Sequence, residues 1–211
     1  MRTWTAEDPK AGLMARKRAA IVQAALAAFL IEGYAGSSVN RIAADAGVSI
    51  KTLYRHFDDK ADLFVAVIQD ACVTPSDAPV PPWYTEAPLA GLTAAGSEHL
   101  RYTLSPEQLA LYRVVVRESP RFPELGQLYQ REVLGRRIAT FTGYLATWPA
   151  DLRAKIAVPE RAAYLFSALL HEEILDTALL GGPSADEADI DRRAADAAAR
   201  FLTIAEAGQL S

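Results

Sequence analysis

Cysteine is nearly absent from this 211-residue chain, in which Cys72 is the single one. One thiol cannot form an intramolecular disulfide, so the sequence favours a reducing, cytoplasmic compartment. The N-terminal residues lack the apolar stretch of a secretory signal. The longest apolar runs, such as residues 164–170, are too short to cross a bilayer, so we expect no membrane partner. Cys72 is interpreted as a buried structural thiol, with a redox switch as the alternative.

Sustained alternation of apolar and polar residues, the pattern of a half-buried strand, is also missing. Apolar residues instead recur at intervals of three and four, and hydrophobic residues make up 51% of the chain, enough for a sizeable core. The sequence therefore predicts an all-α protein with about nine helices. These helices are expected at residues 12–32, 38–46, 50–57, 60–72, 89–104, 106–119, 124–146, 159–180 and 185–207.

Residue types at the helix ends support several of these boundaries. Gly33 and Gly47 are expected to end the first and second helices, and Ser49 is expected to cap the third. Residues 105–108 and 184–187 each have the spacing of a capping box. Prolines recur between residues 73 and 88 and exclude a helix there, so this stretch is interpreted as a stiff linker or a mobile loop.

Positive charge is scarce overall but concentrated at one end. The formal net charge is −4, yet residues 10–60 hold eight basic and four acidic residues, whereas residues 73–211 hold 13 basic and 18 acidic ones. A local basic excess favours contact with polyanions even when the whole chain is acidic. The first quarter of the chain is therefore the candidate nucleic-acid-binding part.

Residues 38–57 have the pattern of a helix-turn-helix. Ile42 and Ala43 face inward from the first short helix, Gly47 supplies the positive φ of the turn, and Leu53 and Phe57 face inward from the second helix. The outward side chains of the second helix include cations, hydroxyls and aromatics, which suit phosphates and base edges in a major groove.

The wider pattern between residues 20 and 64 resembles the DNA-binding domain of the TetR/AcrR transcriptional regulators. It comprises Phe29-x3-Gly33-Tyr34, Ser37-Ser-Val-x2-Ile42-Ala-x2-Ala46-Gly-Val-Ser, Thr52-Leu-Tyr-x-His-Phe57 and Lys60-x2-Leu63-Phe64. Residues 111–128 also resemble the ligand-binding domain of one AcrR-type subgroup. The resemblance implies a DNA-binding domain in residues 1–60 and an effector-binding and dimerisation domain in residues 61–211, which contains the Pro-rich loop 73–88.

The resemblance also assigns residues to double-stranded operator DNA. Ile50 is apolar, so base reading by it is limited to contact with a thymine methyl. Lys51, Arg55 and Lys60 have the alternative of a solvated basic face, and Tyr54 that of a core aromatic. The residues expected at the DNA are Ser38, Asn40, Arg41, Ser49, Ile50, Lys51, Thr52, Tyr54, Arg55, His56 and Lys60.

A homodimer is expected, because one helix-turn-helix covers half a site and two half-sites lie about 34 to 36 Å apart. The last two predicted helices have broad apolar faces and would pair with their mates in a four-helix bundle, as the resemblance also implies. Packing inside one subunit is the alternative. The candidate interface residues are Tyr164, Phe166, Leu169, Leu170, Ile174, Ala194, Ala198, Phe201 and Leu202.

A small, largely apolar effector is implied by the resemblance to repressors of this family, in which a molecule bound in the body alters the spacing of the heads. Periodicity does not separate residues that line such a site from core residues, and most of the candidates are expected to be ordinary core. Arg113, Arg117 and His171 are the expected buried polar groups; either arginine would meet an anionic effector or pair with Glu118 or Glu172. The candidate effector-binding residues are Leu104, Tyr112, Arg113, Val116, Arg117, Phe122, Tyr129, Phe141, Tyr144, Trp148, Phe166 and His171.

An enzyme is the rival class. His171, Glu172, Glu173 and Asp176 form the one tempting cluster, but His171 and Asp176 are five residues apart rather than at the i, i+4 spacing of a helical zinc site. No Gly-rich phosphate loop, Gly-x-Ser-x-Gly elbow or Cys-x-x-Cys pair is present. We therefore expect no enzymatic activity, no metal and no cofactor. A dimeric interaction module without DNA binding remains the other alternative.

Overall fold

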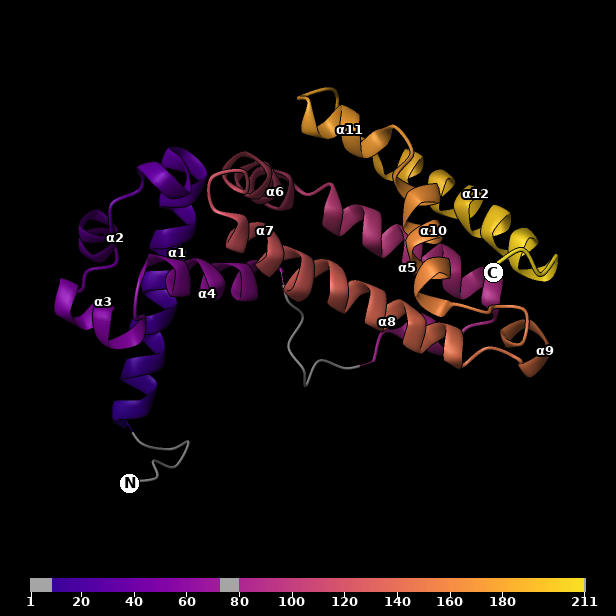
Figure 1. Ribbon diagram of the computed structural model, residues 1–211, viewed down its shortest axis with the longest axis horizontal. Coiled ribbons are helices and arrows are strands. Elements are labelled where there is room, and N and C mark those ends of the chain that lie inside the picture. The colour runs from indigo at the N-terminus through magenta and orange to yellow at the C-terminus, as the bar shows by residue number, and fades with distance from the viewer. Residues whose placement is uncertain (1–8, 73–79, 211) are drawn as a thin grey trace. The chain divides into compact units, whose positions relative to one another are not determined.

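The computed structural model describes residues 9–72 and 80–210. Within these residues the fold is all-α, as predicted, and the β structure is confined to an isolated bridge between Ile156 and Leu210. The backbone packs into two compact units: Met1–Val73 with Ala110–Val133, and Thr74–Leu109 with Leu134–Ser211. The helices of both are labelled in Figure 1. The functional boundary expected near residue 60 stays a prediction, because these units are defined by packing alone.

The first unit is built around a cluster of aromatic rings. It contains α1 (Pro9–Gly36), α2 (Val39–Asp45), α3 (Ile50–His56), α4 (Lys60–Cys72), α7 (Pro123–Tyr129) and most of α6 (Pro106–Glu118). Phe64 lies 5.3 Å, centroid to centroid, from both Phe29 and Tyr34, and Tyr34 lies 5.0 Å from Phe122. Edge-to-face contacts of this kind add to the stabilisation from apolar burial.

Helix α1 is longer than predicted, but it breaks where the prediction ended it. Gly33 has a φ of 75° and a ψ of 170°, a backbone conformation that glycine tolerates. A Cβ at this position would also lie 2.0 Å from Nη2 of Arg117. The backbone conformation therefore requires glycine at this break, whereas the Arg117 side chain is flexible and can move aside.

The expectation that no segment is long and apolar enough to cross a bilayer is wrong for α1. Residues 11–36 meet that condition by length and composition alone. The same helix buries Ile21, Ala25 and Phe29 in the core of the first unit. Since a core helix passes the same test, this finding is weak evidence for a membrane.

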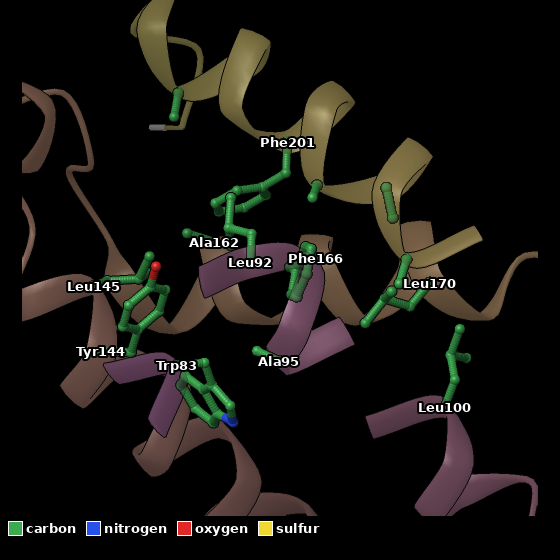
Figure 2. Packing of buried hydrophobic residues seen from close by; sticks show 14 of the residues in the cluster. Trp83, Leu92, Ala95, Leu100, Tyr144, Leu145, Ala162, Phe166, Leu170 and Phe201 are labelled. Carbon is green, nitrogen blue, oxygen red and sulfur yellow. The ribbon is translucent and has the colours of Figure 1, made fainter. Parts of the chain in front are cut away.

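The second unit is organised by the packing of α5 (Pro88–Thr103) against α12 (Glu187–Glu206), which run side by side in Figure 1. A Cβ at Gly96 would lie 3.2 Å from Cβ of Ala194, so small residues permit this close approach. The other elements are η1 (Pro82–Thr85), α8 (Gly135–Ala146), α9 (Ala150–Arg153), α10 (Pro159–His171) and α11 (Ile174–Leu179). Figure 2 shows Phe166 and Phe201 in the shared core, with centroids 5.3 Å apart.

The single helix predicted for residues 124–146 is wrong. It is divided into α7, a π-helical turn at Gln130–Leu134 and α8. The turn falls where the chain passes from the first unit to the second. The residues before and after the turn pack into different cores. Their apolar side chains therefore need not lie on one face of a single regular helix. The short helix α9, which begins directly after Pro149, was not predicted either.

The single helix predicted for residues 159–180 is also wrong. It breaks between α10 and α11 at Glu172, a non-glycine residue with a φ of 32°. The Glu172 carboxylate accepts a hydrogen bond from Nη1 of Arg200 on α12, 2.8 Å away, and the Glu173 carboxylate is bound by Arg193. These contacts join residues that are far apart in the sequence and lie next to the break. The helical periodicity of residues 159–180 alone therefore does not predict the break.

The two predicted capping boxes have different outcomes. Ser105 caps α6, since Oγ of Ser105 accepts a hydrogen bond from N of Gln108 at 3.3 Å. The box predicted at residues 184–187 is wrong, because Asp186 caps α12 and accepts from N of Asp189 at 2.8 Å. The helix therefore begins later than the sequence pattern indicated.

The Pro-rich stretch is not wholly a linker. Pro82 opens the 3-10 helix η1, a short form that tolerates proline at its start. Trp83 is buried in the core of the second unit, and its Nε1 donates to Oε2 of Glu98 at 3.0 Å. Residues 73–79 and the Cys72 side chain lie outside the described residues, so the predictions made for them stay predictions.

Replacement of Gly91 by alanine is expected to destabilise the protein. Alanine normally favours a helix over glycine by about 1 kcal/mol. At Gly91 the new Cβ would lie 2.0 Å from the hydroxyl of Tyr144 and 2.8 Å from the backbone oxygen of Trp83. We expect a loss of about 1–3 kcal/mol from overpacking, measured by chemical denaturation. Gly12→Ala is the matched control, because nothing lies within 4 Å there, and an equal or positive change at Gly91 would contradict the packing described.

Candidate functional site

The angle between α2 and α3 is fixed by buried side chains. Ile42, Ala43 and Leu53 are almost completely buried, and N of Val48 donates to O of Ala43 at 2.9 Å. Gly47 has a φ of 65°, as the turn requires. An angled pair of short helices joined by such a turn defines a helix-turn-helix.

The first turn of α3 is capped and open to solvent. Oγ of Ser49 accepts a hydrogen bond from N of Thr52 at 3.1 Å, which confirms the predicted cap. Ser49, Ile50 and Lys51 are exposed, whereas Thr52 is half-buried. Tyr54 is 51% exposed, so the alternative of a core aromatic is wrong. These side chains lie on the face that the helix pair leaves outward.

The predicted DNA-contacting residues at the start of α2 are all exposed, but they differ in whether their side chains already have partners in the protein. Ser38 is the exposed N-cap residue, and its hydroxyl makes no capping hydrogen bond. Asn40 is exposed. Arg41 is exposed but paired, with Nη1 2.7 Å from Glu32 and Nε 3.7 Å from Asp45. The carboxylates of Glu32 and Asp45 therefore compete with a phosphate for the Arg41 guanidinium.

The C-terminal end of α3 is partly enclosed, with Arg55 exposed and His56 half-buried. Nη2 of Arg55 lies 3.3 Å from Sδ of Met14, and Nε2 of His56 is buried without a hydrogen-bond partner in the structure. Burial is the main cause that lowers the pKa of His56, with Arg55 and Arg18 adding to it. His56 is therefore partly outward, which is within what the helical pattern predicted.

Arg18 was missed as a site residue. It is exposed on α1, and its guanidinium lies 5.3 Å from the centre of the Phe57 ring, directly after α3. The fold thus brings a basic residue of α1 to the end of the second helix. The signal in the sequence was the run of Arg16, Lys17 and Arg18 within the basic segment.

Lys60 is engaged inside the first unit. Nζ donates to O of Ser37 at 2.6 Å and to O of Ala35 at 3.4 Å, and it lies 5.0 Å from the centre of the Tyr34 ring. Burial lowers the pKa of Lys60, and the charges of Glu118 and Glu32 oppose that shift. The lysine therefore satisfies carbonyl groups at the end of α1.

The candidate effector residues are divided between the two units. In the first unit, the rings of Tyr112 and Tyr129 stack at 5.4 Å. Phe122 packs on Tyr34, and Val116 is 55% exposed. Arg113 and Arg117 are exposed, so the expectation that they are buried is wrong, and Arg117 pairs with Glu118 at 3.1 Å as one alternative proposed.

In the second unit, the candidate effector residues are mostly core. Tyr144, Trp148 and Phe166 are buried, and Phe141 stacks on Phe166 at 4.8 Å. Leu104 is half-buried against the same core. An open depression of about 830 Å³ is lined by other residues, namely Pro82, Trp83, Glu86, Ala90, Ala94, Ser97, Glu98, Arg101, Tyr102 and Asp191. His171 instead pairs with His99, a partner that sequence reasoning missed.

The cluster that suggested a metal-dependent enzyme does not converge. Glu172 and Glu173 are held by arginines of α12, away from a shared site with His171. Among residues 9–72 and 80–210, no group of three or more histidine, cysteine, aspartate or glutamate residues is placed to hold a metal ion.

Most of the candidate dimer residues are already buried within one chain. Tyr164 is 59% exposed, and Leu169 and Leu202 are half-buried. The remaining candidates are buried inside one subunit, which was the alternative. They are Phe166, Leu170, Ile174, Ala194, Ala198 and Phe201.

The fold and the exposed α3 define a helix-turn-helix regulator. Residues 21–67 match the family described as bacterial regulatory proteins, tetR family, and residues 90–204, more than half of the chain, match the AefR-like transcriptional repressor, C-terminal domain. The chain belongs to the TetR family.

Solved structures with the same fold extend over nearly the whole chain. A TetR-family regulator from Mesorhizobium loti has a TM-score of 0.75 and 25% identity, covering 90% of this chain and 97% of its own. The flavonoid-responsive regulator FrrA has a TM-score of 0.72 and 28% identity, covering 89% and 95%. Curated HTH-type transcriptional regulators of Staphylococcus aureus are 55% identical over 38 residues, which is 18% of this chain and 20% of theirs.

Replacement of Lys60 by alanine is expected to destabilise the protein. The change leaves the carbonyls of Ser37 and Ala35 without the ammonium donor. Because Lys60 is only partly buried, we expect a loss of about 1 kcal/mol, measured by chemical denaturation. Lys51→Ala is the matched control, since Lys51 is exposed; an equal effect of both changes would contradict an internal role for Lys60.

Proposed function

We propose that the protein is a homodimeric transcriptional repressor whose α3 enters the major groove of double-stranded operator DNA. The observation that supports this most directly is the capped first turn of α3, which presents Ile50, Lys51 and Tyr54 to solvent. A helix in this setting reads base edges with its N-terminal residues. No reaction is part of this proposal, and its place of action is the cytoplasm, where the DNA lies.

Two kinds of contact are proposed for the DNA-binding face. Ile50, Lys51 and Thr52 reach bases, because they occupy the first turn of α3. Phosphate contacts come from side chains around that turn, which fix the register without reading sequence. We assign this second role to the exposed or partly exposed Ser38, Asn40, Arg41, Ser49, Tyr54, Arg55 and His56, together with Arg18. Lys60 is proposed to support this face by bracing the end of α1.

Release from the operator is proposed to follow binding of a small, largely apolar molecule in the second unit. The similarity to FrrA, which is described as flavonoid-responsive, supports an aromatic effector. Phe141 is the partly exposed member of the aromatic cluster with Tyr144 and Phe166, so its ring has suitable chemistry for such a molecule.

Two substitutions in α3 are expected to have different effects on DNA binding. Tyr54→Phe removes an exposed hydroxyl, so affinity should fall about fivefold for all duplexes. Lys51→Ala removes a base-reading side chain, so affinity should fall about tenfold or more for the preferred sequence and less for others. The measurement is fluorescence anisotropy with a duplex selected by the wild-type protein from a random pool, at several salt concentrations.

Arg153→Ala is the control for these changes, since Arg153 is an exposed cation on α9 in the second unit. It should leave binding unchanged. Unchanged binding in Lys51→Ala and Tyr54→Phe would show that α3 is not the DNA-reading helix. A wild-type dimer that binds no duplex even in dilute buffer would instead favour the interaction module.

Dimerisation is proposed to use the residues of the second unit that remain exposed. Tyr164→Glu places a charge at this surface and should shift the protein toward monomer, because an unpaired charge in an interface is strongly unfavourable. Sedimentation velocity measures the shift. Ile31→Glu is the control, since Ile31 is 80% exposed in the first unit. A wild-type monomer, or an unchanged dimer in Tyr164→Glu, would contradict this interface.

A further inference from the structure

Two of the three histidines in the chain meet inside the second unit. Nε2 of His99 on α5 lies 2.9 Å from Nε2 of His171 at the end of α10, and the rings stack with centroids 5.0 Å apart. Burial is the main cause that holds the pKa of His99 well below its ordinary value and that of His171 at about 4. Both rings are therefore neutral near pH 7, and one donates to the other.

Arg137 on α8 adds a cation beside this pair. Its Nη1 donates to Oγ1 of Thr103 at 3.3 Å, and its guanidinium lies 4.7 Å from the centre of the Tyr102 ring. Thr103 follows His99 by one helical turn, so both lie on the same face of α5. Among the described residues, no carboxylate forms an ion pair with Arg137. The hydrogen bond and the ring contact of this partly buried guanidinium are therefore with neutral groups, the Thr103 hydroxyl and the Tyr102 ring.

The charge around the pair favours an anion over a metal ion. Arg137 lowers the pKa of both imidazoles, and Asp176 opposes it at His171 alone. The same positive field repels a divalent cation, and two imidazoles without further ligands make an incomplete metal site. A carboxylate would instead find a guanidinium fork and an imidazole N–H, which form strong charge-assisted hydrogen bonds.

Apolar groups lie next to this polar cluster. Phe141 follows Arg137 by one turn of α8, and its ring stacks on Phe166 with an angle of 10° between the planes. His99, His171 and Arg137 are each partly exposed. A flat molecule with an acid group at one end matches this combination of a cation and an aromatic wall.

We propose that Arg137, Thr103 and the His99–His171 pair form the recognition site for the carboxylate of a flat, apolar effector. The proposal rests on the proposed function, in which the second unit receives the effector. Arg137 supplies the charge that is recognised, and the histidine pair supplies a neutral N–H donor at its side. Phe141 holds the apolar body of the ligand.

The test compares an aromatic acid with its neutral amide. Isothermal titration calorimetry with the full-length protein at pH 7.5 should show that benzoate or cinnamate binds at least about tenfold more tightly than the matching amide. Arg137→Gln should abolish this preference, whereas Arg136→Gln, at the neighbouring exposed cation, should keep it. Equal affinity for acid and amide, no binding of either acid, or an unchanged preference in Arg137→Gln would overturn the proposal.

Two further measurements separate loss of the carboxylate site from loss of folding. Arg137→Lys keeps the charge and should retain the preference for the acid. In the wild type, side-chain nitrogen NMR should show cinnamate shifting the signals of His99 and His171 but not that of His56. A protein that binds DNA but not the acid contradicts the carboxylate site alone, whereas one that binds the acid but no DNA contradicts the proposed function alone.

Discussion

The buried contact between α2 and α3 is the constraint on which the proposed DNA-binding face depends. Ala43 is 2% exposed and Leu53 is fully buried, so the two helices approach closely and cannot change their angle without opening the core. A larger residue at position 43 would separate them. With that angle fixed, the helical period alone decides which side chains of α3 face solvent, and the Ser49 cap positions its first turn.

The internal hydrogen bonds of Lys60 set a cost for any use of this residue at a DNA phosphate. If its ammonium moved to a phosphate, the carbonyl of Ser37 would lose its donor, at a cost of about 1 kcal/mol. The end of α1 where this carbonyl lies is also where Arg117 crowds Gly33 and where Glu118 acts on Lys60. The C-terminal turn of α6 therefore lies close to the end of α1 that Lys60 braces, within the same unit.

Local signals predicted the first unit well because its elements are short and their ends are set by neighbouring residues. The bounds of α4 and the Ser49 cap follow from such signals. The break at Glu172 accompanies contacts with Arg193 and Arg200, and the His99–His171 pair joins residues 72 positions apart. The helical periodicity and residue spacing within one segment do not show which residues of distant segments will meet. The exposed face of α3 was predictable, whereas the internal bonds of Lys60 were not, since they depend on how α4 meets the end of α1.

The composition of α12 limits how two copies of this chain can pair. One face of the helix buries Ala194, Ala198 and Phe201 in the core of its own unit. Its solvent face carries charged residues, including Asp189, Arg192, Asp196 and Arg200. In a two-fold dimer each charge meets the mate's copy of the same surface, so acids and arginines must alternate to avoid like-charge contacts. The apolar part of such an interface then falls to residues such as Tyr164 on α10. A dimer built this way combines a small apolar patch with a polar rim, which makes its strength sensitive to salt.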